Sequence, residues 1–395
     1  MSEPFSAYDL PAPTYRRELT EVGRGTPTGE LFRRYWQPVA LSTDATTTPE
    51  RVTILGETLV LFRDGAGRPG LLYPRCAHRG TDLYYGRVEE GGIRCCYHGW
   101  LYDVEGRCLD QQCEPGGGRR RDRVRQPCYP LIEYHGLIFA YLGPPGRRPA
   151  FPVYDVLEDQ VDGQHVVADD TSLGSGGPVI VDCNWLQHWE NVLDPFHVPV
   201  LHGSLSGLQF NERLAAMPSV AFEDTPCGVR SVQDRDLPDG RHLRRISEVM
   251  VPNLRIVPDP KVRSSGPDNK IAWVLPIDDT HFRIYTLARL SDPDELRTAR
   301  STYGGKPWAE LTEREHQAMP GDYEAQVGQG PITFHSEEHL ASTDRGVSMV
   351  RRLLMRQLKA MAAGEDPVGV ERGRDTVRVA ISAGNFIDEP ETANA

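Results

Sequence analysis

Cys76-Ala-His78 and Cys95-Cys-Tyr-His98-Gly-Trp100 are two short segments that each pair one cysteine with one histidine. Sixteen residues separate the pairs, which are spaced C-x-H and C-x-x-H. Two thiolates and two imidazoles are the ligand set of a Rieske [2Fe–2S] cluster, with sulfur on one iron and nitrogen on the other. Zinc also takes two Cys and two His, but zinc modules usually place both cysteines in one knuckle. The mixed pairs predict a two-iron cluster held between two loops by Cys76, His78, Cys95 and His98.

Cys96 is the ambiguity at this site, because it directly follows Cys95 and offers an alternative thiolate. Spacing to His98 favours Cys95 as the ligand. The chain has 8 cysteines and no apolar core in residues 1–20 that would mark a signal peptide. In a long chain without an export signal, cysteines are typical of metal ligands and reduced thiols.

Length and charge limit the class of protein. The 395 residues suffice for two or three domains, and the formal net charge of -12 argues against a nucleic-acid binder. No segment approaches the roughly 20 apolar residues of a membrane span. The sequence therefore predicts a cytoplasmic protein that needs neither nucleic acid nor a membrane as partner.

Short strand patterns dominate residues 36–142, for example at 52–55 and 58–62. Both cysteine–histidine loops project from this all-β stretch. A Gly/Pro-rich linker follows at 143–152, which indicates a domain boundary. We expect an N-terminal helical segment at 1–35 that packs on the catalytic domain, a Rieske domain at 36–150 and a catalytic domain at 151–395.

The second half mixes strands and helices. A strand is predicted at 179–182, and apolar residues at 185, 186, 189, 192 and 193 form a helical stripe. Strand patterns return across 220–290. A last helix has apolar positions 347, 350, 354, 358 and 361 and ends at Gly364. The chain as a whole is predicted to be α+β, with helices layered on a sheet after residue 150.

Asn191-Val-Leu-Asp194-Pro-Phe-His197-Val-Pro-Val-Leu-His202 carries a second candidate metal site. Histidines five apart on an unbroken helix do not share a face, because five residues turn about 140° beyond one full turn. Pro199 is expected to break the helix and let both imidazoles converge. Two histidines plus one carboxylate form the facial triad of non-haem Fe(II), which leaves open positions for O₂. A pair of structural histidines is the alternative.

The carboxylates of this site are less certain. Asp194, three residues before His197, is a candidate to accept the ring N–H that the metal does not use. Asp322 is favoured as the third ligand and Asp344 is the alternative, although each could cap a helix instead. Spacing does not decide between these two.

Taken together, these residues resemble the catalytic α subunit of Rieske non-haem iron oxygenases. The likeness is greatest to the phthalate and phenoxybenzoate dioxygenase branch. Three segments carry it, at 25–38, 322–332 and 338–346. The resemblance implies an all-β Rieske domain beside a helix-grip catalytic domain. Cys96 departs from the family, which often has proline after the second ligand cysteine.

The resemblance also assigns roles. It maps the iron ligands onto His197, His202 and Asp322, a bridging aspartate onto Asp194, and an asparagine near the iron onto Asn191. It implies a head-to-tail homotrimer in which His98 of one subunit faces Asp194 of the next. Electrons would come from NAD(P)H through a separate flavin/iron–sulfur reductase or ferredoxin. Consistent with this, the chain has no convincing G-x-G-x-x-G unit.

The resulting prediction is an oxygenase that inserts O₂-derived oxygen into a small aromatic substrate, which can carry a carboxylate. Dioxygenation, monohydroxylation and O-demethylation all stay open, as do non-aromatic or natural-product substrates. A carboxylate would need a pocket arginine, and one of Arg244 and Arg245 should face inward on a strand, unless both lie on the surface. A non-catalytic Rieske electron carrier is the rival from another class, but the 245 residues beyond position 150 argue against it.

Overall fold

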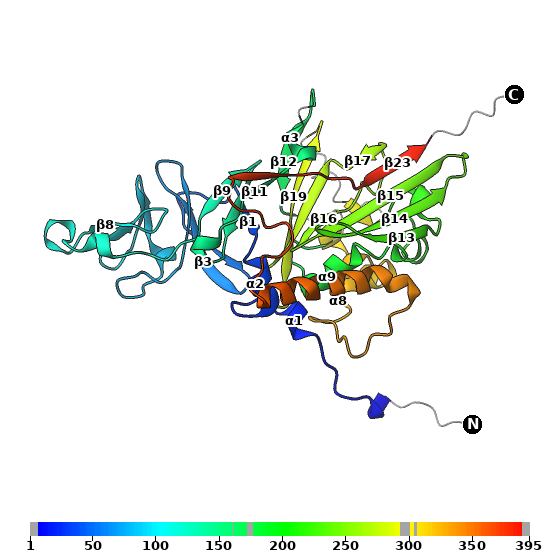
Figure 1. Ribbon diagram of the computed structural model, residues 1–395, viewed down its shortest axis with the longest axis horizontal. Coiled ribbons are helices and arrows are strands. Elements are labelled where there is room, and N and C mark those ends of the chain that lie inside the picture. Colours follow the sequence, from blue (N-terminus) through cyan, green and yellow to red (C-terminus); the bar gives the residue numbers. More distant parts are fainter. Residues whose placement is uncertain (1–6, 160, 172–176, 293–300, 304–305, 389–395) are drawn as a thin grey trace.

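The computed structural model describes residues 7–159, 161–171, 177–292, 301–303 and 306–388. Figure 1 shows an elongated molecule, with the first set of strands at one end and a large sheet with its helices at the other. No helix within these ranges is both long and apolar enough to cross a bilayer.

Short antiparallel strands build the N-terminal half. They form three sheets, ordered β1-β10-β9, β2-β3-β4 and β5-β6-β7-β8. The strands are β1 Trp36–Leu41, β2 Glu50–Ile54, β3 Glu57–Arg63, β4 Pro69–Leu72, β5 Arg87–Glu89, β6 Gly92–Arg94, β7 Trp100–Tyr102, β8 Cys108–Gln111, β9 Leu131–Tyr134 and β10 Leu137–Tyr141. The predicted all-β region is confirmed.

A large antiparallel sheet forms the second half, in the order β12-β19-β18-β16-β15-β14-β13, with β23 also paired to β15 and to β17. β11 pairs in parallel with β22, whereas β20 and β21 form an antiparallel pair. The strands are β11 Phe151–Tyr154, β12 His165–Asp169, β13 Ser219–Asp224, β14 Gly228–Asp236, β15 His242–Met250, β16 Leu254–Ile256, β17 Gly266–Pro267, β18 Lys270–Pro276, β19 Phe282–Leu290, β20 Ser301–Tyr303, β21 Lys306–Pro307, β22 Thr376–Val379 and β23 Gly384–Asp388.

Helices lie against this sheet, which confirms the predicted α+β class (Figure 1). α4 packs on β18, and α9 packs on β13 and β14. The helices are α1 Arg17–Thr20, α2 Pro27–Phe32, α3 Asp155–Glu158, α4 Trp185–Asn191, α5 His197–Val200, α7 Glu313–Ala318, α8 Asp322–Val327 and α9 Arg345–Ala362. Single turns are η1 Ala7–Asp9, η2 Leu83–Tyr85, η3 Pro115–Gly117, η4 Arg121–Arg123, η5 Pro145–Arg147, η6 Leu201–Leu205, η7 Glu212–Leu214, η8 Trp308–Glu310 and η9 Ser342–Asp344. The strand predicted at 179–182 is wrong, because that stretch forms only a single bridge from Val181 to Phe282.

Local sequence explains where the helices begin. The Thr26 side chain accepts the Gly29 N–H and Pro27 opens α2, the positions at which threonine and proline favour the start of a helix. α9 approaches its neighbours closely because Gly346 has no side chain. A Cβ there would lie 2.5 Å from Leu193 O and 2.6 Å from the Phe222 ring.

One apolar core runs through both halves of the molecule. The Phe139 ring of β10 packs edge-on against Trp273 of β18 at 5.2 Å, and Phe32 packs the same way on Trp185 at 4.9 Å. Burial of such rings stabilises by roughly 1.5–3 kcal/mol each, so these contacts hold the halves in one orientation.

Arg351 ties α9 to the helix that precedes the second candidate metal site. Its guanidinium forms ion pairs with Glu190 of α4 at 2.6 Å and with Glu338 at 2.5 Å, and Arg351 and Glu190 are both largely buried. Arg351→Met leaves buried carboxylates unpaired, so we expect a loss of about 3–5 kcal/mol in stability and a lower melting temperature. Arg356→Met on the same helix is the control, because its pair with Asp224 is exposed. Equal melting temperatures for the two variants would contradict this role.

Candidate metal centres

Two matching turns present the cysteine–histidine pairs. Gly80 N–H donates to Cys76 O at 2.8 Å, and Gly99 N–H donates to Cys95 O at 3.1 Å. Both glycines have positive φ, +76° and +68°, and a Cβ on Gly99 would lie 2.2 Å from Gln112 Oε1. These positions therefore require glycine for conformational and steric reasons.

The cysteines of the two turns point at each other. Cys76 and Cys95 are each 3% exposed, and Cys76 Sγ also lies 3.3 Å from the Tyr102 hydroxyl. Hydrogen bonding to Cys95 lowers the pKa of Cys76 to about 5, while the same contact raises the pKa of Cys95. Cys96 is exposed. The geometry thus brings Cys95, and not its neighbour, to Cys76.

The imidazoles lie at the outer rim of the turns. The His78 and His98 rings are 4.6 Å apart, and His78 stacks flat on Trp100 at 4.4 Å. His78 is exposed and His98 is partly exposed, so the histidine side of the site faces outward. A buried sulfur side and an accessible nitrogen side suit a centre that exchanges electrons with another protein surface.

Gln126 anchors the first turn and is a residue that sequence reasoning missed. It is 1% exposed, and its amide donates to Tyr73 O and Arg75 O while it accepts the Ala77 N–H. Only its place between two short strands, beyond a long arginine-rich loop, could have indicated it, and that signal is weak.

The spread of these four side chains fits two irons better than one zinc. Among the described residues, only His197, His202 and Asp322 bring three ligand atoms within 4.8 Å of one another. A tetrahedral zinc site holds its four ligands within that range, because its bonds are only about 2.0–2.3 Å long. A two-iron cluster spreads two ligands over each iron.

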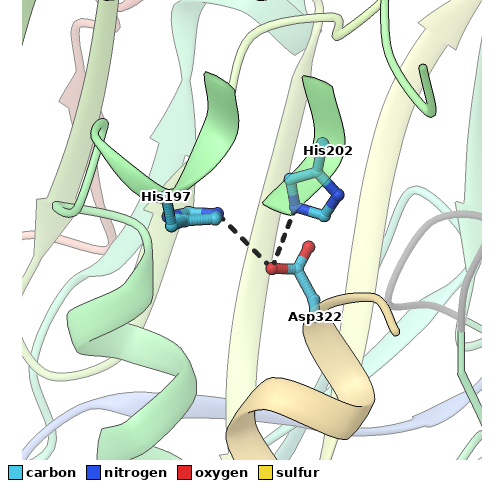
Figure 2. Close-up of side chains that lie close together, drawn as sticks. All are labelled: His197, His202 and Asp322. Carbon is cyan, nitrogen blue, oxygen red and sulfur yellow. Dashed lines mark ion pairs between the residues drawn. The ribbon is translucent and has the colours of Figure 1, made fainter. Parts of the chain in front are cut away.

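His197, His202 and Asp322 converge as Figure 2 shows. Asp322 Oδ1 lies 3.5 Å from His197 Nε2 and 3.3 Å from His202 Nε2. His202 is buried, whereas the side chains of His197 and Asp322 are 19% and 26% exposed, so the centre is accessible from outside. Asp344 lies elsewhere, where it accepts the Ala341 N–H at the start of η9.

The backbone reaches this geometry differently from the expected break at Pro199. Pro199 lies inside α5, and the next turn, η6, is a π-helix in which Ser206 N–H donates to Leu201 O, five residues back. Of the two histidines, His197 lies in α5 and only His202 lies in the π turn, a kind of turn that is frequent at functional sites. The expected helix break is therefore wrong, but the rings of His197 and His202 do lie close together, 5.3 Å apart.

An oxygen lies beside the far nitrogen of each imidazole. Asp194 Oδ2 lies 3.5 Å from His197 Nδ1, and Gln209 Oε1 lies 2.6 Å from His202 Nδ1. Asp194 lies in the turn between α4 and α5, where its other oxygen accepts the Phe196 N–H. The Gln209 oxygen accepts the proton of His202 Nδ1 and so leaves the Nε2 lone pair of that ring toward the centre. His197 Nδ1 forms no hydrogen bond among the described residues, and Asp194 acts on this ring through its charge. Gln209 is a further residue that sequence reasoning missed.

The electrostatics of the triad favour a cation. Burial lowers the pKa of His197, but Asp194 and Asp322 outweigh it and raise that pKa to about 10. Burial raises the pKa of Asp322, yet His197 and His202 hold it well below its usual range. His202 Nε2 is buried without a hydrogen-bond partner. Two imidazoles and one carboxylate with open positions beside them fit mononuclear Fe(II).

Asn191 and Phe210 complete the surroundings. Asn191 Nδ2 donates to Asp322 Oδ1 at 3.4 Å, and the Phe210 ring stacks on His202 at 4.1 Å. The asparagine was expected near the iron, and it lies one hydrogen bond from the carboxylate of the triad.

The adjacent residues Arg244 and Arg245 on β15 point to opposite faces of the sheet, as neighbouring residues of a strand do. Arg244 is outside and pairs with Asp234 at 2.9 Å. Arg245 is 6% exposed, and its guanidinium donates to Pro258 O, Asp259 O and Asn385 Oδ1. The prediction that one of the two faces inward is confirmed.

Comparison with known proteins agrees with both centres. Residues 35–130 match the family model "Rieske [2Fe-2S] domain". The chain is 50% identical to a phenoxybenzoate dioxygenase subunit alpha from Ectopseudomonas oleovorans, over 95% of this chain and 93% of that one. It is 39% identical to a tert-butanol monooxygenase / tert-amyl alcohol desaturase oxygenase subunit from Aquincola tertiaricarbonis, over 92% and 80%.

The fold agrees as well. A solved structure from Pseudomonas putida CBB5, the NdmA QL mutant with theobromine, superposes with a TM-score of 0.65 at 22% identity and covers 88% of this chain and 99% of that one. With a matched cluster domain, relatives aligned along nearly the whole length and a shared architecture, the chain belongs to the Rieske non-haem iron oxygenases, as a catalytic α subunit.

Proposed function

We propose that this oxygenase acts on a small aromatic substrate that carries a carboxylate. The observation that carries the proposal is the convergence of His197, His202 and Asp322 at an accessible centre. The relative named for phenoxybenzoate supports this substrate class. In our proposal these three side chains bind the mononuclear iron, Asp194 orients His197, and Asn191 positions Asp322. The bound Fe(II) would supply O₂ activation through its open positions.

We further assign the [2Fe–2S] cluster to Cys76, His78, Cys95 and His98. Imidazole ligation raises the potential of such a cluster, which lets it accept and store one electron. The electrons would come from NAD(P)H through a separate flavin/iron–sulfur reductase or ferredoxin. The buried cysteines and the outward-facing histidines support transfer through the histidine side.

The proposed assembly is a head-to-tail homotrimer in which His98 of one subunit approaches Asp194 of the next. In Figure 1, β8 and its sheet lie at one end of the molecule, well away from α8 with Asp322. This separation supports transfer between subunits rather than within one chain. We also propose a cytoplasmic location, in keeping with an intracellular NAD(P)H supply.

Three sequence units fit this scheme, at residues 1–35, 36–150 and 151–395. The family model at 35–130 supports the second unit. The packing of Phe32 on Trp185 and the hydrogen bond from Asn184 Nδ2 to Thr20 O support an N-terminal segment seated on the catalytic unit.

Turnover under ¹⁸O₂ tests this function. The holoenzyme and a surrogate reductase are offered a panel of aromatic acids, and we expect labelled product together with a third iron per chain beyond the [2Fe–2S] pair. One labelled oxygen atom indicates monooxygenation and two indicate dioxygenation. Turnover of tertiary alcohols but of no aromatic would overturn the substrate class and favour the chemistry named for the second relative.

A further inference from the structure

Three arginine side chains project from the large sheet on the face that α9 covers. Phe222 lies beside Gly346 of α9, so its side of β13 faces that helix. Phe222 is paired with Ser231 of β14, and Arg235, four residues further along β14, points to the same side as Ser231. Gln233 pairs with Arg245, and Val249 of the same strand face pairs with Arg255 of β16. Because directly paired residues point to one side of a sheet, all three guanidinium groups lie on this face: Arg235, Arg245 and Arg255.

Two of the three are already engaged by the protein. Arg245 donates to two backbone carbonyls and to Asn385, as described above. Arg235 is 3% exposed and donates to Ala216 O at 3.0 Å and to Gln233 Oε1 at 3.3 Å. Their donors mainly hold the sheet and its loops in place.

Arg255 is different. Among the described residues its guanidinium forms no hydrogen bond and no ion pair, and its Nε is buried without a partner. The side chain as a whole is partly exposed, and the residue paired with Arg255 on the adjacent strand β18 is the small Ala272. Burial of a cation without a counter-charge is costly, and here burial lowers the pKa of Arg255 to about 10.

The charge that acts on Arg255 belongs to a carboxylate of the triad. Asp322 acts on Arg255 through its charge but shares no hydrogen bond with it, since its Oδ1 contacts His197, His202 and Asn191. The pKa of His188 falls to about 3 through burial and the charge of Arg255, so this ring is neutral.

His188 also links Arg255 to the helix of the triad. It bonds Gln326, which lies four residues after Asp322 on α8. The Nε2 atoms of His188 and Gln326 are likewise buried without partners. Unpartnered polar atoms thus gather between α4, α8 and β16, next to the triad.

We propose that Arg255 binds the carboxylate of the substrate and so orients the ring toward His197, His202 and Asp322. A guanidinium grips a carboxylate through two parallel N–H···O bonds, and the free donors of Arg255 match that need. The inference rests on the proposed function, because it specifies where an aromatic acid binds. Arg255 is a positioning residue and takes no part in bond making.

Binding to the iron-loaded holoenzyme tests this role, with 3-phenoxybenzoate and its neutral amide as probes. Wild-type protein should prefer the carboxylate. Arg255→Gln should weaken carboxylate binding about 10- to 100-fold, the loss typical of one hydrogen-bonded charge, and leave amide binding nearly unchanged. Arg255→Lys keeps the positive charge but not the paired N–H donors of the guanidinium, so it should retain part of the preference for the carboxylate over the amide. Arg244→Gln, on the opposite face of the sheet, is the matched control and should change neither affinity.

Several outcomes overturn the proposal. If the wild type binds the acid and the amide with equal affinity, Arg255 does not recognise the carboxylate. The same conclusion follows if Arg255→Gln weakens the binding of both equally. Loss of the mononuclear iron in both variants would make it a structural counter-charge to Asp322. If the wild type binds and oxidises only uncharged aromatics, the proposed role of Arg255 is wrong, although the protein is still an oxygenase. If it oxidises no aromatic at all, the proposed substrate class fails as well.

Discussion

His197→Ala is expected to abolish oxygenation and to remove the mononuclear iron while the Rieske cluster remains. The variant deletes one of only two imidazoles at the triad and leaves Asp194 without the ring that it orients. Metal analysis should show one iron fewer per chain, and the reduced protein should keep its Rieske EPR signal. The loss of activity should be complete within detection, because the described residues bring together only this one set of three His, Cys or carboxylate ligand atoms.

His242→Ala is the control for this experiment. His242 lies on β15 and pairs with Asp234 and Asp236 at the surface, so its loss should affect neither metal nor turnover. Loss of the Rieske signal in His197→Ala would contradict the division into two independent centres.

Cys95→Ser is expected to lose the cluster and, with it, all turnover driven by reductant. The buried Cys95 thiol lies against Cys76, and serine cannot replace a thiolate on iron with comparable strength. The absorption of the cluster should disappear, whereas the mononuclear iron should still bind at the triad. Reduction assays with dithionite separate this effect from a failure of the reductase to dock.

Cys96→Ser tests the assignment directly, because it makes the same chemical change one residue away. Its side chain is exposed, so the variant should keep the cluster and near-normal activity. A bleached Cys96→Ser protein beside a coloured Cys95→Ser protein would reverse the assignment of the ligand.

The sequence predicted the features that depend on local chemistry. Mixed Cys/His spacing indicated the cluster, strand-like alternation indicated the β region, and the apolar positions from 347 to 361 indicated α9. These signals succeed because each depends on residues that are close in the chain. The α+β class followed for the same reason.

Features that depend on tertiary contact could not be derived from residue spacing, and for Asp322 only the family resemblance indicated the ligand. Asp322 and Asp344 both stand near a helix start, and only packing places the first against the histidines, 120 residues away from His202. Nothing in the sequence distinguishes Gln209 from other loop glutamines, and only the folded chain brings it within 2.6 Å of His202 Nδ1. Arg255 is one of many arginines, and only the folded sheet shows that its guanidinium has no partner in the part of the chain that the structure describes.

The helical segment that carries His197 in α5 and His202 in the π turn Leu201–Leu205 is limited in how it can change during evolution. One inserted or deleted residue between His197 and His202 would rotate the second ring by about 100° relative to the first. Changes in chain length should therefore accumulate in the loops between strands, where they reshape the space for substrate without moving the iron. Substrate range can diversify by insertion, while the five-residue register of the two histidines cannot.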